Sequence, residues 1–296
     1  MTKKAENQKE KIIRKGKQEK IKNNKICIIY NYLYIMEINK YKSIAFITIF
    51  FIFIIFFYML IEKEFFTNIE TVNFYVITMG NEDRLQNIKN QIEKMNNNND
   101  TYKVNIDKID AVVGKNLDLD QLIKDGILTP KIYDKENSFN PKLENRKNEI
   151  GCCLSHYKTY ETIANNNSKN SKYSVVFEDD FDVCDKFLYE LDKIITDTIN
   201  EKIDFDIIML AIIGNSGEKI YSNIEKINCE NSPCYYAHAY LINNKSIDKI
   251  LDAMKYIDNI ADVQIFQKHN EGKIKVLRLE SSIVNQNSTY TTIRNN

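Results

Sequence analysis

The longest apolar segment of the chain is residues 44–61, "IAFITIFFIFIIFFYMLI", which contains no charged side chain. A helix of this length can cross the hydrocarbon core of a bilayer. The segment begins more than forty residues into the chain and no small-residue cleavage pattern follows it, so it is typical of an uncleaved signal anchor. The alternative is a buried core helix, although such helices seldom lack polar residues for about five turns.

Beyond the anchor, two kinds of apolar pattern alternate along the chain. Short runs of β-branched and aromatic residues predict strands, and apolar residues at helical spacing predict helices. The predicted strands are residues 72–79, 104–113, 173–177, 205–211, 235–242 and 274–279. The predicted helices are residues 82–95, 149–164, 184–199 and 245–256. This alternation favours an α/β domain with a mainly parallel central sheet.

Charge is distributed unevenly about the apolar segment. Residues 1–42 hold 12 of the 41 basic residues but only 4 of the 41 acidic ones. The positive-inside bias therefore predicts a basic cytoplasmic tail, residues 1–43, before the anchor. A stem, residues 62–72, and a folded domain, residues 73–296, would then lie on the lumenal or exoplasmic side, as in type II proteins of the endoplasmic reticulum or Golgi. A basic tail can also bind nucleic acid, but the apolar segment that follows it favours a role in membrane orientation. We therefore expect no nucleic acid partner.

Cysteine usage fits an exported domain. Cys229 and Cys234 bracket the turn-like "ENSP", so a local disulfide is feasible there. Three other cysteines lie in apolar surroundings and are expected to be small buried hydrophobes: Cys152, Cys153 and Cys184. Four Asn-x-Ser/Thr sequons follow the anchor, although they arise easily by chance in so Asn-rich a chain: Asn99, Asn166, Asn244 and Asn287.

A predicted strand ends abruptly on carboxylates in "VVFEDDFDV", residues 175–183. Glu178, Asp179 and Asp180 would lie at the carboxyl end of this strand, where open α/β sheets bind ligands. Like charges there raise one another's pKa unless a cation neutralises them, and oxygen ligands suit Mg²⁺ or Mn²⁺. The alternative is a solvated loop that caps the helix beginning near Cys184.

Four sequence blocks occur in a characteristic order: "FYVITMGNEDRLQNI", "NEIGCCLSHYKTYETI", "SVVFEDDFDV" and "AHAYLINNKSIDKIL". Together they resemble glycosyltransferase family 25, the group that contains lipooligosaccharide and collagen β-galactosyltransferases. The resemblance covers roughly residues 74–296, and its second and third blocks are the specific ones.

The resemblance implies a GT-A-like nucleotide-sugar-binding domain that uses Mn²⁺ or Mg²⁺ and inverts the sugar carbon. We therefore expect a membrane-anchored enzyme that moves a hexose, galactose or glucose, from a UDP-sugar to a hydroxyl of a glycan, glycolipid or protein acceptor. Residues 115–147 have no counterpart that we can align with the family. Acceptor specificity could be set there, and the sequence leaves the oligomeric state open.

The acidic triplet matches the metal motif of the family. Asp180 is the expected metal ligand, with Glu178 either a second ligand or, like Asp179, a contact to the ribose or to a metal-bound water. Arg84 matches the basic residue after the first strand, and its guanidinium suits the nucleotide phosphates. Thr78, at the end of the same strand, is a further expected donor contact.

The resemblance also assigns roles to residues outside the triplet. Ser155 and His156 match the "SH" of the family; Ser155 is expected at the donor, and His156 is expected to act in catalysis unless it makes only a structural hydrogen bond. His238 is expected to orient the sugar or to complete the metal shell, whereas His269, in a polar stretch, is expected to be exposed.

Inverting transfer needs a base that accepts the proton of the acceptor hydroxyl. Asp262 in "ADVQIF" matches an acidic position of the family and is the expected base, although a helix-capping role is an alternative. Asp258 and Glu280 are the other candidates for the base.

The sequence leaves two other functions open. Asp180-Phe181-Asp182 also fits the start of a phosphatase motif with a nucleophilic aspartate, but Cys184 replaces its final Thr or Val and no downstream Gly-Asp metal motif follows. Alternatively, the domain has lost turnover and serves as a membrane-tethered glycan-binding or scaffolding module.

Overall fold

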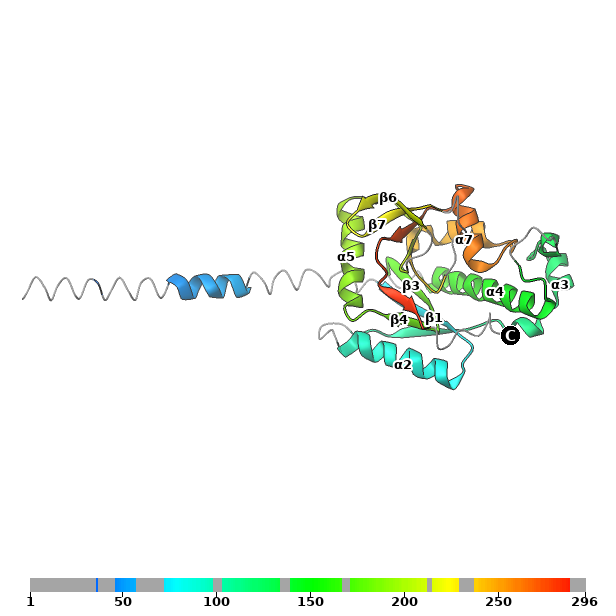
Figure 1. The fold of residues 1–296 in the computed structure, drawn as a ribbon, viewed down its shortest axis with the longest axis horizontal. Coiled ribbons are helices and arrows are strands. Elements are labelled where there is room, and N and C mark those ends of the chain that lie inside the picture. Colours follow the sequence, from blue (N-terminus) through cyan, green and yellow to red (C-terminus); the bar gives the residue numbers. More distant parts are fainter. Residues whose placement is uncertain are drawn as a thin grey trace, which may run out of the picture. The chain divides into compact units, whose positions relative to one another are not determined.

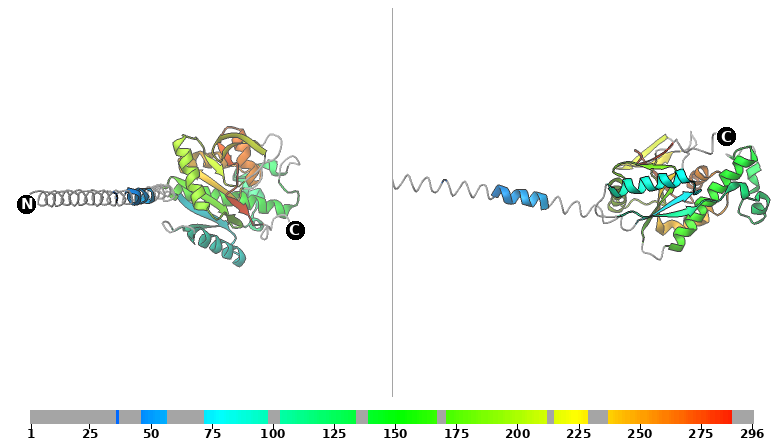
Figure 2. Two further views of the ribbon diagram at one scale, coloured as in Figure 1. Left: turned by 60° about the vertical axis from the view of Figure 1, so that its left-hand side comes forward. Right: turned by 90° about the horizontal axis from the view of Figure 1, so that it is seen from below.

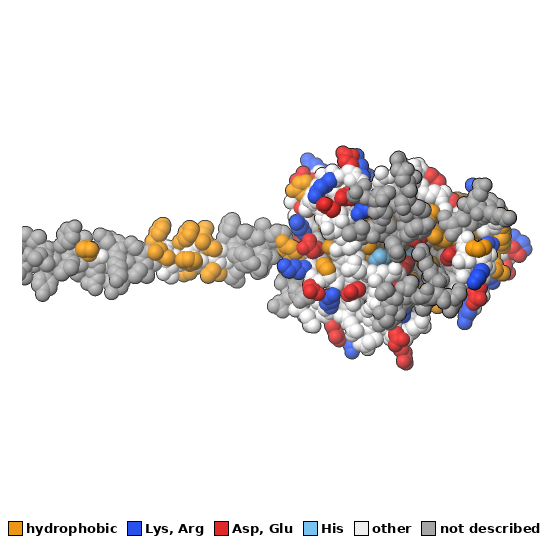
Figure 3. Space-filling view, in the orientation of Figure 1, with side chains coloured by type: hydrophobic (Ala, Val, Ile, Leu, Met, Phe, Trp, Pro, Cys, Tyr) orange, Lys and Arg blue, Asp and Glu red, His pale blue; other side chains and the backbone are white. Residues whose placement is uncertain are grey.

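The computed structural model describes residues 36, 46–56, 72–97, 103–133, 139–166, 171–211, 215–228 and 237–287. The chain divides into two units, Met1–Lys63 and Glu64–Asn296. In the first unit, residues 46–56 are helical and their apolar side chains are exposed (Figure 3). Within the described ranges, no helix is both long enough and apolar enough to span a bilayer. The remainder of the predicted anchor, stem and tail lies outside these ranges, apart from residue 36 in the tail and Val72, the last residue of the predicted stem, which begins the first strand.

The second unit contains a large sheet with the strand order β2-β1-β3-β8-β5-β9-β7-β6 and a small sheet of β10 and β4 (Figure 1). Three pairings of the large sheet are parallel, β1 with β2 and β3, and β5 with β9; the other four are antiparallel. The α/β class is thus confirmed, but the sheet is mixed. The strands are β1 Val72–Thr78, β2 Ile106–Asp110, β3 Tyr173–Glu178, β4 Phe181–Val183, β5 Ile207–Met209, β6 Asn215–Tyr221, β7 Ile224–Asn228, β8 Ala239–Asn243, β9 Val276–Leu279 and β10 Val284–Gln286.

Helices cover both faces of the large sheet (Figures 1 and 2). Successive side chains of a strand point to opposite faces, so Phe74 and Val76 of β1 pack in the core formed with α2 and α5, whereas Tyr75 and Ile77 join α4, α6 and α7. The helices are α2 Glu82–Asn97, α3 Leu119–Lys124, α4 Leu143–Asn166, α5 Phe187–Asn200, α6 Ile247–Met254 and α7 Ala261–Asn270, with 3₁₀ turns at Gly114–Asn116, Pro130–Tyr133 and Asn244–Ser246.

The structure refines several predicted elements. Residues 115–147, for which the sequence predicts no helix or strand, contain α3 and the first turn of α4. Their apolar side chains pack with α4 in a third core that includes Leu119, Leu128 and Ile132. The hairpin of β6 and β7 lies at the edge of the large sheet and was not predicted. Its sequence is rich in Lys, Asn and Glu, which obscures the alternation that would mark a strand.

The predicted disulfide falls outside the described residues, as do Cys229, Cys234 and the sequon at Asn99. Cys153 is buried as expected, while Cys152 and Cys184 are only partly buried. Asn244 is also buried, and its Nδ2 donates to the carbonyl and the hydroxyl of Ser171. A glycan on that nitrogen would break both hydrogen bonds, so this sequon is a chance match in the folded domain.

Candidate functional site

The acidic triplet lies where the sequence places it, at the end of a central strand. Glu178 is the last residue of β3, and Asp179 and Asp180 form the turn into β4. The turn is anchored by the stacked rings of Phe177 and Phe181, whose centroids are 4.2 Å apart. Because β1 runs parallel to β3 and Ile77 pairs with Glu178, the loop after β1 meets the acidic turn.

Arg84 lies in the first turn of α2, directly after this loop, and binds the acidic turn. Its Nη1 lies 2.7 Å from Asp179 Oδ1 and 3.3 Å from Asp180 Oδ2, and all three side chains are nearly buried. The second oxygen of Asp179 accepts a hydrogen bond from the backbone N–H of Met79 at 3.2 Å. Arg84 is therefore positioned at the triplet, where it neutralises carboxylates; its expected contact with the nucleotide phosphates stays a prediction.

Two residues that the sequence did not single out complete the turn. Asn87, one helical turn after Arg84, donates from Nδ2 to the carbonyls of Asp179 and Phe181, at 3.0 Å each. Gln286 on β10 donates from Nε2 to Asp180 Oδ2 at 3.0 Å. The i, i+3 spacing could have indicated Asn87, but Gln286 is 106 residues from Asp180 and no local signal marks it.

One carboxylate oxygen of Asp180 makes no hydrogen bond with the described residues. This oxygen, Oδ1, is buried. Burial and the nearby charge of Glu178 raise the pKa of this carboxyl to about 6. A buried carboxylate oxygen without a partner is costly, and a divalent cation would satisfy it. Asp180 therefore offers one oxygen of the kind that Mg²⁺ and Mn²⁺ prefer as a ligand.

Glu178 is directed toward α4 rather than toward Arg84's ion pairs. Its Oε1 lies 3.1 Å from His156 Nε2, while His156 Nδ1 lies 2.8 Å from the hydroxyl of Tyr240, which in turn donates to Tyr160 at 3.2 Å. Burial raises the pKa of Glu178, but the hydrogen bond and charge of His156 outweigh it, so the net shift is downward. His156 thus faces the triplet at the inner end of a buried chain of polar groups.

The sequence "IGCCLSH" positions this face of α4. A Cβ on Gly151 would lie 2.6 Å from the carbonyl oxygen of Val112, so only glycine permits the close approach of α4 to the segment after β2. Ser155 Oγ then donates to the Gly151 carbonyl at 2.7 Å and accepts from the Val112 N–H at 2.8 Å. Ser155 therefore joins α4 to its neighbour, which places Cys152 and His156 at Glu178.

The other expected donor contacts lie close to the same strand ends. Thr78 is buried and its Oγ1 accepts from the Gly80 N–H at 3.0 Å, so it shapes the turn before Arg84. His238 is buried beside Glu178, whose backbone N–H donates to the His238 carbonyl at 2.8 Å. Burial lowers the pKa of His238, which favours its neutral form.

Asp262 lies in the first turn of α7, just after α6, and its Oδ1 accepts from the N–H of Val263. Its charge helps to raise the pKa of the thiols of Cys152 and Cys153, after burial in each case. It therefore lies on the α4 side of the site. Its role as the base stays a prediction.

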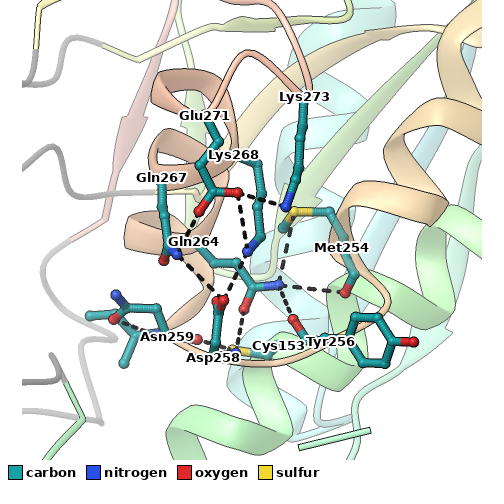
Figure 4. Close-up of polar contacts among 11 residues, drawn as sticks. Cys153, Met254, Tyr256, Asp258, Asn259, Gln264, Gln267, Lys268, Glu271 and Lys273 are labelled. Atoms are coloured by element: carbon teal, nitrogen blue, oxygen red, sulfur yellow. Dashed lines mark hydrogen bonds and ion pairs between the residues drawn. The ribbon is translucent and has the colours of Figure 1, made fainter. Parts of the chain in front are cut away.

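The two alternative bases each pair with a lysine, although Oδ1 of Asp258 is buried without a hydrogen-bond partner among the described residues. Asp258 accepts from the buried Lys268 at 2.9 Å and from Gln267 at 3.4 Å, within the network shown in Figure 4. Glu280 is exposed and pairs with Lys219 of β6 at 2.7 Å. The expectation for His269 was wrong: it is partly buried, and its Nδ1 accepts from the N–H of Val276, because the turn after α7 folds back over it.

Comparison with known proteins yields three relatives of similar identity. The chain is 28% identical over 141 residues to a probable inactive glycosyltransferase 25 family member 3 of Rattus norvegicus, covering 44% of this chain and 23% of the relative. It is 27% identical over 180 residues to the inactive member 3 of Mus musculus, covering 56% and 28%. It is 29% identical over 157 residues to procollagen galactosyltransferase 1-A of Xenopus laevis, covering 51% and 24%. The chain thus matches about a quarter of the length of these relatives.

A family-level match is more extensive. The sequence profile described as glycosyltransferase family 25 (LPS biosynthesis protein) matches residues 71–265, which is more than half of the chain. The matched region includes β1, Arg84, the "IGCCLSH" helix, the acidic turn and Asp262. The chain belongs to glycosyltransferase family 25.

Proposed function

We propose that this protein transfers a hexose from a UDP-sugar to a hydroxyl of a glycan, glycolipid or protein acceptor, with inversion and with Mn²⁺ or Mg²⁺. Galactose and glucose are the favoured sugars, and the name of the Xenopus laevis relative supports galactose. The observation that carries the proposal is the buried, unpartnered Oδ1 of Asp180, beside Arg84 at the end of β3.

In this proposal Asp180 holds the metal, and the bound metal supplies neutralisation of the leaving diphosphate. Oε1 of Glu178 is already bonded to His156. Glu178 is therefore assigned no direct bond to this metal, and it acts through its negative charge beside Asp180. Arg84 keeps the acidic turn in place through Asp179 and contributes positive charge where the donor phosphates would bind.

Asp262 acts as the base that accepts the acceptor's proton. Its position in the first turn of α7, and the contribution of its charge to the raised pKa of the Cys152 thiol on α4, support this assignment, whereas Arg84 lies on α2. An inverting reaction needs the base and the leaving group on opposite faces of the sugar carbon. The separation of Asp262 and Arg84 onto different helices supports that division of roles.

We further propose that residues 44–61 tether the domain to a membrane, with the basic tail cytoplasmic and the domain lumenal or exoplasmic. The described part of this segment supports the proposal, because residues such as Phe46, Phe53 and Phe56 present apolar side chains to the surroundings. Exposed apolar side chains around a helix are stable in lipid and costly in water.

A second candidate is a domain without turnover that binds glycans or acts as a scaffold. The names of the Rattus norvegicus and Mus musculus relatives favour this alternative, since both are described as inactive. Retention of the acidic triplet and of Arg84 favours activity.

The test is a donor screen with the purified full chain in detergent. We expect Mn²⁺-dependent release of UDP from UDP-galactose or UDP-glucose, even without an acceptor, and no hydrolysis of a generic aryl phosphate. UDP release that is unaffected by EDTA would contradict the metal-dependent mechanism. Binding of UDP-sugar without any release, across donors and acceptors, would favour the inactive module, and aryl phosphate hydrolysis would favour a phosphatase.

A further inference from the structure

Three potential metal ligands of different chemical types converge beside the acidic turn. Cys152 Sγ, His156 Nε2 and a carboxylate oxygen of Glu178 lie within 4.8 Å of one another. Cys152 and His156 are one helical turn apart on α4, and Glu178 reaches them from the end of β3. Secondary-structure elements rather than loops therefore hold all three ligands.

The spacing is that of ligands around a single small ion. Cys152 Sγ is 3.8 Å and His156 Nε2 is 3.1 Å from Glu178 Oε1. Ligands bound at about 2.0–2.3 Å around a tetrahedral ion are roughly 3.3–3.8 Å apart, so the three side chains need to move only slightly. One sulfur, one nitrogen and one oxygen are typical ligands of Zn²⁺, whereas Mg²⁺ and Mn²⁺ prefer oxygen.

The surroundings of the cluster also suit a cation. The Tyr240 hydroxyl, 2.8 Å from His156 Nδ1, can accept the N–H of that nitrogen, so a cation that displaces the proton between Nε2 and Glu178 would bind the lone pair of Nε2. A second hydrogen bond of this kind is usual for a metal-binding histidine. Burial first, and then the negative charge of Glu178, raise the pKa of the Cys152 thiol, so this thiol must lose its proton when it binds a cation.

We propose that Cys152, His156 and Glu178 form a second metal site, specific for a thiophilic divalent cation such as Zn²⁺ and separate from the Mg²⁺ or Mn²⁺ proposed at Asp180. The bound cation joins α4 to the end of β3 and holds the Glu178 carboxylate next to the acidic turn. A fourth coordination position is left for water. Metal binding by Cys152, His156 and Glu178 does not depend on whether the protein is an active transferase.

Co²⁺ substitution tests the proposal, because thiolate-bound cobalt absorbs in the near ultraviolet and tetrahedral cobalt absorbs strongly in the visible. We expect the full chain in detergent to bind one equivalent of Co²⁺ with both absorptions, and Zn²⁺ to displace it. Cys152→Ser should abolish the thiolate band. Cys153→Ser is the matched control and should retain it, since Cys153 Sγ points instead to the carbonyl of Asn259 at 3.4 Å. Asp180→Asn should also retain it, which separates this site from the one proposed for the donor.

The proposal is overturned if the full chain shows no thiolate band, if Cys152→Ser keeps it, or if Asp180→Asn loses it. Zinc-edge X-ray absorption of the wild-type chain with one equivalent of Zn²⁺ provides a measurement that does not depend on the folding of a variant. One sulfur scatterer at about 2.3 Å with nitrogen and oxygen neighbours is expected. A shell with no sulfur, or with two or more, contradicts the proposed ligands.

Discussion

Arg84 Nη1 and Asp179 Oδ1 form a nearly buried ion pair at 2.7 Å, although the two residues are 95 positions apart in the sequence. The pair fastens the helix after β1 to the turn after β3. It holds the backbone that carries Asp180, so the site depends on a contact made between two strand–helix units.

Removing the cation of this pair should destabilise the fold. Arg84→Met leaves Asp179 buried without its partner, and loss of one member of a buried pair costs about 3–5 kcal/mol. Urea unfolding of the metal-free chain measures the loss. Lys89→Met on the same helix is the control, because Lys89 and Glu93 are exposed and such pairs contribute roughly 0–1 kcal/mol. Equal losses in the two variants would contradict the structural role given to Arg84.

Gly151 should not tolerate a methyl group. In an open helix Gly→Ala stabilises by roughly 0.5–1 kcal/mol, but here the added Cβ would lie 2.6 Å from the Val112 carbonyl oxygen. We expect Gly151→Ala to lower the unfolding free energy by about 1–3 kcal/mol, the usual cost of overpacking. Asn165→Ala, at an exposed position of the same helix, should be neutral or stabilising. An increase in stability for Gly151→Ala would show that α4 can move away from Val112.

The sequence predicts the local features of this site and misses those made by distant segments. Strand β3 and its carboxylates follow from the apolar run that ends at Glu178, and α4 follows from its helical spacing. The contact of Gln286 with Asp180 depends on the pairing of β10 with β4, and no pattern within either short strand specifies that partner. Likewise, the sequence favours parallel pairing, but the antiparallel insertion of β8 between β3 and β5 is a property of chain topology.

Cys152 is a single residue whose role the sequence does not predict, because that role depends on a contact with a distant segment. Its apolar neighbours suggest a buried hydrophobic role, but its orientation toward Glu178 depends on how α4 packs against β3. The i, i+4 spacing of Cys152 and His156 was the available signal, and it gains meaning only once a carboxylate faces both residues.

Asp180 should make the stability of the metal-free chain depend on pH. Its folded-state pKa of about 6 lies above the ordinary value of 3.8, so the folded state binds the proton more tightly. The resulting stabilisation is fully present below pH 3.8 and is lost as the pH rises through 6. Between pH 7 and pH 5, wild type should therefore gain about 1 kcal/mol relative to Asp180→Asn, measured as the difference in unfolding free energy. A constant difference across this range would contradict the raised pKa.

The proposed topology predicts which part of the chain a protease can reach. In intact microsomes, an epitope placed before Lys42 should be removed, whereas the domain after Glu62 should be protected until detergent is added. The opposite pattern would reverse the orientation. Digestion of both parts without detergent would contradict membrane insertion of residues 44–61.

The most direct test of the central claim, that Asp180 holds the metal at the donor site, is the Mn²⁺-dependent turnover of UDP-sugar by Asp180→Asn. We expect a loss of at least roughly 10²- to 10³-fold, the cost of removing one preorganised group that stabilises transition-state charge. Asp182→Asn, which changes a partly exposed carboxylate that faces Lys94, should keep near wild-type turnover. The melting temperature of metal-free Asp180→Asn should be unchanged or higher, because the substitution relieves repulsion from Glu178. Wild-type turnover in Asp180→Asn would contradict the account.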